Sequence, residues 1–131
     1  MFMRFVHGLP VRGMASREGL FAAAYALQGS AELDAFSRGE LDDLLAWFRQ
    51  NLKIPPRFNR TKSKNHDRRD TRGLSWFKPT ARQHLDKAFE LAELLTRHGI
   101  AIEVLRAARI GYVIYEDDHQ LVAEPFADVR S

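Results

Sequence analysis

Basic residues gather in one stretch of this chain, and their chemistry is that of phosphate binding. Of the 20 Lys and Arg residues, eight lie between Lys53 and Arg72, beside only two acids, Asp67 and Asp70. The stretch carries a net charge of +6, whereas the other 111 residues together carry −3. Clustered Lys and Arg raise the local electrostatic potential and release counterions when they bind phosphates. The sequence therefore predicts an anionic partner.

The side chains of this stretch suit a nucleic acid. Arginine bridges two phosphate oxygens, lysine acts as a point charge, and an exposed aromatic ring stacks on a base. The candidate contacts with nucleic acid or another anion are Arg57, Arg60, Lys62, Lys64, Arg68, Arg69, Arg72 and Trp76. We therefore favour a non-enzymatic nucleic-acid-binding domain that uses residues 57–72. Another polyanion, an acidic protein and a solvated stretch without a specific partner are the alternatives.

Acidic residues nearer the C-terminal end offer a second candidate site. Glu116, Asp118 and His119 supply ligands that a divalent cation accepts, and such an ion would permit metal-assisted phosphodiester cleavage. The spacing argues against this site, because Asp residues in a short connection between strands favour a hairpin turn. The five histidines are scattered along the sequence, and no serine near any of them is identified as a nucleophile by a motif. We predict no catalytic residues and no cofactor, with a divalent-metal-dependent phosphodiesterase as a further alternative.

The composition is that of one globular domain spanning residues 1–131. Of these residues 45% are hydrophobic and 28% are charged, and a chain of this length can bury a self-sufficient core. Because there is no cysteine, disulfides, thiolate metal sites and cysteine nucleophiles are excluded, which suits a reducing compartment. The apolar runs are too short to cross a bilayer. We expect a cytoplasmic protein without a membrane partner.

Apolar spacing and end signals predict three helices. The first follows Ser16 as its N-cap and ends before Gly29. The second is marked by a capping box over residues 37–40 and must end before Pro55, because proline restricts the residue that precedes it. The third follows a capping box over residues 80–83, contains His84 in an exposed first turn, and ends at His98. Residues 53–73, between the second and third helices, are predicted to form a long basic loop.

Alternating patterns predict the strands and with them the fold class. The strands are expected over residues 1–7, 74–78, 102–105, 112–116 and 120–124. The order β-α-α-β-α-β-β-β indicates an α+β domain with helices packed on one mixed sheet, including a parallel crossover over residues 74–105. Short turns link the last three strands, which predicts an antiparallel three-stranded meander. Its edge strand would suit docking, so a protein-interaction module or homo-oligomer is another alternative.

Two segments carry a resemblance to known proteins. They are Arg72-Gly-Leu-Ser-Trp-Phe-Lys-Pro79 and the run from Gly111 to Phe126, which reads Gly-Tyr-Val-Ile-Tyr-Glu-Asp-Asp-His-Gln-Leu-Val-Ala-Glu-Pro-Phe. With the chain around them, from about residue 36 to residue 126, they resemble small bacterial proteins of no assigned function. The resemblance implies a bacterial source and supplies no catalytic residues.

Overall fold

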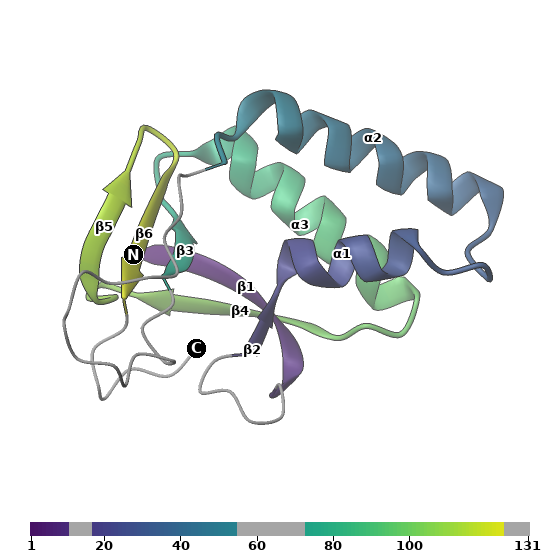
Figure 1. Ribbon diagram of the computed structural model, residues 1–131, viewed down its shortest axis with the longest axis horizontal. Coiled ribbons are helices and arrows are strands. Elements are labelled where there is room, and N and C mark those ends of the chain that lie inside the picture. Colours follow the sequence, from purple (N-terminus) through teal and green to yellow (C-terminus); the bar gives the residue numbers. More distant parts are fainter. Residues whose placement is uncertain (11–16, 55–72, 125–131) are drawn as a thin grey trace, which may run out of the picture.

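The computed structural model describes residues 1–10, 17–54 and 73–124 (Figure 1). Its strands are β1 (Phe2–Pro10), β2 (Arg17–Gly19), β3 (Leu74–Phe77), β4 (Ile102–Ala107), β5 (Tyr112–Glu116) and β6 (Gln120–Glu124). Its helices are α1 (Leu20–Gln28), α2 (Ala35–Asn51) and α3 (Arg82–Arg97). The predicted α+β class and the order of the elements are confirmed, with the short strand β2 added before the first helix.

Strand β1 is central in the sheet and pairs on both of its edges. One edge carries β4 over six residue pairs, from Phe2↔Ala107 to His7↔Ile102. The other edge carries β3, through the pair Met3↔Phe77, and β2 further along the strand. Beyond β1, β3 pairs with β6 and β6 pairs with β5. The sheet is therefore built outward from the first strand of the chain.

Every described strand pair is antiparallel, which corrects the predicted mixed sheet and its parallel crossover. The predicted three-stranded meander is also wrong, because β4 pairs with β1 and only the β5–β6 hairpin remains. The physical reason lies in β1, which buries an apolar side chain on each face, Phe5 on one and Val6 on the other. A strand buried on both faces takes a central place and needs a neighbour on each edge. Local turn signals cannot reveal a pairing between strands so distant in the sequence.

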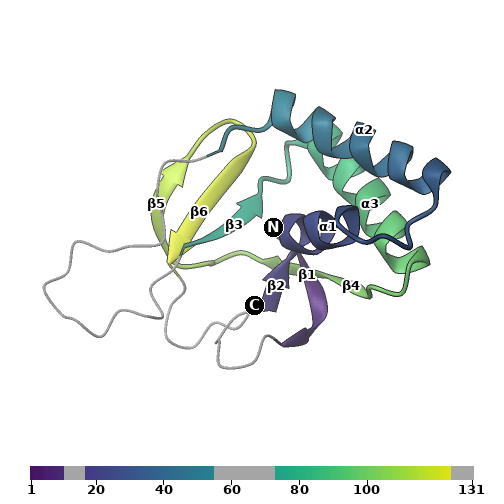
Figure 2. The same ribbon diagram turned by 45° about the vertical axis from the view of Figure 1, so that its right-hand side comes forward.

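All three helices cover one face of the sheet (Figures 1 and 2). Phe5 and Phe77 project from that face into the main core, where they meet Leu41 and Leu45 of α2 and Leu91 of α3. The leucine spacing on α2 places these side chains on one side of the helix, as the sequence predicted. Among residues 1–10, 17–54 and 73–124, no helix combines the length and apolar character needed to span a bilayer.

The opposite face of the sheet, here called the rear face, carries a second and smaller apolar cluster. Its members are the buried Trp76, Ile110, Leu121 and Ala123 with the partly buried Phe2, Leu105 and Ala107. Ile110 belongs to the connection between β4 and β5, so this connection packs against the rear face. The sheet therefore separates two apolar clusters, and only the larger one involves helices.

The helix starts differ from the predicted capping boxes. Helix α2 begins after Asp34, whose carboxylate accepts a 2.9 Å hydrogen bond from the backbone N–H of Ser37. This bond holds the pKa of Asp34 below its ordinary value. Helix α3 begins at Arg82 without a side-chain cap, and α1 begins after Gly19 rather than after Ser16. The start of α1 is displaced because residues 17–19 pair with β1 as a strand.

The predicted end of α3 is confirmed. His98 is the C-cap, and the backbone N–H of Ile100 donates a 2.9 Å hydrogen bond to the carbonyl of Leu95. Gly99 has a φ of 86°, in the left-handed region that glycine adopts without a steric penalty. This closed end sets the direction in which the chain returns to the sheet as β4.

The packing of α2 on the sheet can be tested by truncating one side chain. Leu45 is 1% exposed, so Leu45→Ala should lower the free energy of unfolding by about 2–5 kcal/mol through lost burial and a residual cavity. Phe36 lies on the same helix at 79% exposed, and Phe36→Ala should change the stability by less than about 0.5 kcal/mol. Urea denaturation followed by circular dichroism measures both variants. Equal losses of unfolding free energy in the two variants would contradict the orientation of α2, in which Leu45 faces the core and Phe36 faces solvent.

Candidate functional site

Most of the predicted anion-binding residues lie outside the described part of the chain. These are Arg57, Arg60, Lys62, Lys64, Arg68, Arg69 and Arg72. Trp76 is described, and it is only 2% exposed within the rear-face cluster. Its ring is closed to solvent, so it does not provide the exposed stacking surface that the sequence suggested.

The structure does describe the junction at which the basic stretch begins. The backbone carbonyl of Lys53 accepts a 2.7 Å hydrogen bond from the side-chain amide of Gln120. Two residues earlier, the carbonyl of Asn51 lies 2.7 Å from Nε2 of His84. The β5–β6 hairpin and α3 therefore hold the end of α2 from two sides. Ile54, which follows Lys53, is 84% exposed and lies at the surface beside this junction.

Two imidazole rings stack at this junction. The ring centroids of His84 and His119 are 4.0 Å apart, with 22° between the ring planes, and Trp47 packs its ring 4.9 Å from His84. The predicted exposure of His84 is wrong, because the residue is 5% exposed. The sequence held a signal for this, since His84 precedes the core residues Ala88 and Leu91 by four and seven positions. It therefore shares their face of α3.

Asp117 organises the turn between β5 and β6. Its Oδ1 accepts hydrogen bonds from the backbone N–H groups of His119 and Gln120, at 2.9 and 3.0 Å. Its Oδ2 accepts from the hydroxyl of Tyr115 at 2.9 Å and from the amide of Gln120 at 3.1 Å. Burial acts to raise the pKa of Asp117, but these hydrogen bonds outweigh it and hold that pKa below its ordinary value. Burial and the bond to Asp117 raise the pKa of Tyr115.

The structure does not gather the predicted metal ligands into one site. Glu116 forms an ion pair with Nζ of Lys78 at 2.6 Å, Asp118 is exposed, and His119 stacks on His84. In the part of the chain that the structure describes, no three His, Asp or Glu residues are placed to hold a metal ion. The acidic run is accounted for by turn formation and by the ion pair with Lys78.

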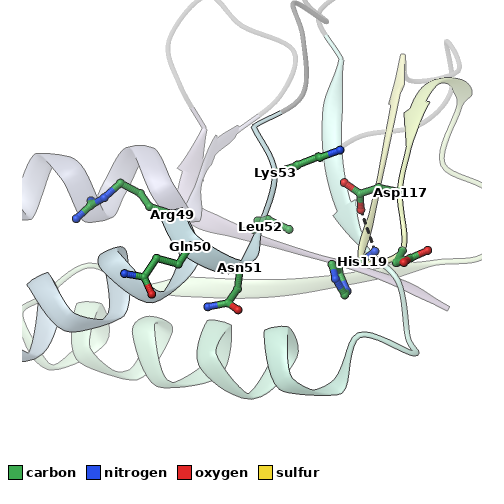
Figure 3. Close-up of a pocket in the computed structure, with 8 residues that line it drawn as sticks. Arg49, Gln50, Asn51, Leu52, Lys53, Asp117 and His119 are labelled. Atoms are coloured by element: carbon green, nitrogen blue, oxygen red, sulfur yellow. Dashed lines mark hydrogen bonds between the residues drawn. The ribbon is translucent and has the colours of Figure 1, made fainter.

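A groove lies between the end of α2 and the β5–β6 turn (Figure 3). It has a volume of about 320 Å³ and is lined by Arg49, Gln50, Asn51, Leu52, Lys53, Asp117, Asp118 and His119. Two cations and two carboxylates share this lining, so the groove alone does not select an anion.

No family model, no curated protein and no solved structure matches this chain.

The role of Asp117 predicts a pH-dependent loss of stability on substitution. Asp117→Asn should lower the melting temperature at pH 7, because a charged acceptor of four hydrogen bonds is replaced by a neutral one. The folded-state pKa lies below the unfolded value of about 3.9, so the stabilisation is present above that pH and is lost as the pH falls. Thermal denaturation over a pH series should show that the difference in melting temperature between the unmodified chain and Asp117→Asn becomes smaller in acid.

Asp118→Asn is the matched control, since it changes the same type of residue at an exposed neighbouring position. It should leave the melting temperature nearly unchanged at every pH. A gap for Asp117→Asn that stays constant down to about pH 2 would contradict a stabilising role for the ionised carboxylate.

Proposed function

We propose that this chain is a non-enzymatic domain that binds nucleic acid through residues 57–72. The observation that supports the proposal is the separation of charge, +6 within residues 53–72 and −3 over the rest. Phosphate contacts of this kind supply most of the affinity in nucleic-acid binding. Asn59, Asn65 and His66 lie among the basic residues and can reach base edges or sugars, which favours a nucleic acid over a simple polyanion. The cysteine-free sequence suits a cytoplasmic setting.

The way in which the stretch is anchored also supports this function. It begins at the junction fixed by Gln120 and His84, and it ends at the buried Gly73, directly before β3. Fixed ends reduce the conformational freedom that the stretch must lose when it binds. Of the carboxylates near its start, Glu116 forms an ion pair with Lys78, Asp117 accepts hydrogen bonds within the turn, and Asp118 is exposed. The ion pair with Lys78 reduces the repulsion between Glu116 and an approaching phosphate.

The proposal predicts a specific change in salt dependence. Arg68→Ala combined with Arg69→Ala should weaken binding to a short oligonucleotide about tenfold or more. The slope of log K against log salt concentration should fall in magnitude by about two, because two phosphate contacts are lost. Fluorescence anisotropy at several sodium chloride concentrations, with single- and double-stranded RNA and DNA, measures both quantities.

A double variant with the same charge change serves as the control. Arg97→Ala combined with Arg106→Ala removes two exposed cations from α3 and β4, and it should leave affinity and salt slope nearly unchanged. Equal effects of the two double variants would mean that only net charge matters. No binding to any of the four nucleic acids at low salt would rule the proposed function out.

The edge strand β5 supports a second candidate function, which is self-association. Among the described residues β5 pairs only with β6, and Tyr112, Val113 and Ile114 are 66%, 53% and 40% exposed. An apolar edge strand is a template for pairing with another chain. If two copies paired their β5 strands antiparallel, with the two Ile114 residues facing each other, Tyr112 of one copy would lie opposite Glu116 of the second copy. No like charges would then face each other.

A β-bulge limits the strength of this association. The register of β5 on β6 shifts between Val113 and Tyr115, so Ile114 is an additional residue in β5. Bulges increase the local twist and blunt the pairing of an edge. We therefore expect a weak, reversible dimer rather than an obligate one.

Ile114→Lys tests this second function, because it places like charges at the centre of the two-fold pairing. The unmodified chain should show a concentration-dependent dimer in sedimentation velocity, and the variant should be monomeric. Ile54→Lys is the control, since Ile54 is apolar and 84% exposed but lies outside the strand. A monomer at all concentrations for the unmodified chain would remove self-association from consideration.

A further inference from the structure

The rear face of the sheet carries a cation in an apolar row. Arg4 of β1 lies opposite Leu105 of β4. On the other edge of β1, Met3 pairs with Phe77, so the next residues along the two antiparallel strands, Arg4 and Trp76, are neighbours on the rear face. The row across four strands is Leu105, Arg4, Trp76 and Leu121.

Within the part of the chain that the structure describes, two nitrogens in this row are buried without a hydrogen-bond partner. Nη1 of Arg4 donates to the carbonyl of Ser75 at 3.1 Å, but Nε of Arg4 and Nε1 of Trp76 have no acceptor among residues 1–10, 17–54 and 73–124. Buried N–H groups in native proteins nearly always have one, and each exception calls for an explanation. These two donors come from adjacent residues of the same row, so both belong to the rear face.

The charge of Arg4 determines what kind of acceptor fits. Burial lowers the pKa of Arg4 to about 10, so the side chain is still a cation at neutral pH. Its rear-face neighbours along β1 are Phe2 and Val6, and a cation among apolar side chains costs free energy unless an anion compensates it. On this face Glu103 lies opposite Val6, one step diagonal to Arg4, and is exposed to solvent. An anion bound directly beside Arg4 and Trp76 would offset the free-energy cost of holding the Arg4 charge in apolar surroundings.

We propose that Arg4 and Trp76 together bind the carboxylate of a small apolar monocarboxylic acid. A guanidinium presents Nε and one Nη side by side, which matches the two oxygens of a carboxylate. A single negative charge balances Arg4, whereas a phosphate dianion would leave excess charge in apolar surroundings. Phe2, Leu105 and Leu121 belong to the cluster around the pair and would contact the apolar body of the acid.

This site is independent of the proposed nucleic-acid function. It lies on the rear face, and a nucleic acid is too large and too charged to reach two nitrogens that are closed to solvent. Local opening of the face must precede binding, so the acid should bind and leave slowly.

Titration with butyrate and with benzoate, followed by ¹H–¹⁵N spectra, tests the proposal directly. The indole Nε1–H resonance of Trp76 should move or be replaced by a new signal, and the change should saturate. Trp47 packs between α2 and α3 on the helix side, so its indole resonance is an internal control and should not change. Sodium chloride, inorganic phosphate and butylamine at matched ionic strength should leave both resonances in place.

Two variants separate binding from folding. Trp76→Phe keeps an aromatic ring but removes the N–H donor, and it should weaken butyrate binding about tenfold or more, measured by calorimetry. Arg4→Met should abolish binding and raise the melting temperature in sodium chloride, because a partly buried charge in apolar surroundings is removed. Arg106→Met, which replaces an exposed cation on β4, should do neither. If Arg4→Met does not fold, the butyrate affinity of Trp76→Phe tests the proposal: an affinity equal to that of the unmodified chain would contradict it.

Two results would overturn the proposal. The first is no saturable change at Trp76 with either acid. The second is a shift of the Trp76 resonance in the unliganded protein when one of the chain's own carboxylates is neutralised, since that carboxylate would then be the acceptor. The variants for this comparison are Glu18→Gln, Asp67→Asn, Asp70→Asn, Glu103→Gln and Asp128→Asn.

Discussion

The pairing of β1 with β4 is the constraint on which the rest of this structure depends. It fixes one edge of β1 and orients the strand so that Phe5 faces the helices while Phe2 faces the rear cluster. With that edge occupied, β3 joins the other edge, and β6 and β5 follow outward. The junction at the end of α2 exists because this order brings Gln120 of β6 within reach of Lys53.

Several features that depend on short spacing could be predicted from the sequence, although the helix starts were not, and features that depend on distant pairing could not be predicted. The leucine stripe of α2, the closed end of α3 and the Asp-based hairpin turn each involve residues within a few positions of one another. The pairing of β1 with β4 has no local signal, so the predicted meander failed. The burial of His84 could be predicted only in part. Its spacing from the apolar residues of α3 indicated a buried position, but its polar side chain indicated exposure to solvent.

The same distinction applies to the two candidate binding sites. The basic stretch is contiguous, so its charge is evident in the sequence, whereas its partner depends on chemistry outside the chain. Arg4 appears in the sequence only as an interruption of a short apolar run. Its importance emerges when the sheet sets it beside Trp76, more than seventy positions away. A site assembled from two strands by register has no sequence signature.

The central position of β1 also has a consequence for how the protein is made. Pairing Phe2 with Ala107 closes a loop of about 100 residues, which is entropically costly and slows folding. At a synthesis rate of about 10 residues per second, β1 waits on the order of ten seconds at the ribosome before β4 emerges. Throughout that interval the edge of β1 that β4 will occupy has no partner strand. An unpaired strand edge is a template for pairing with another chain, so this edge stays open to association with other chains until β4 has been synthesised.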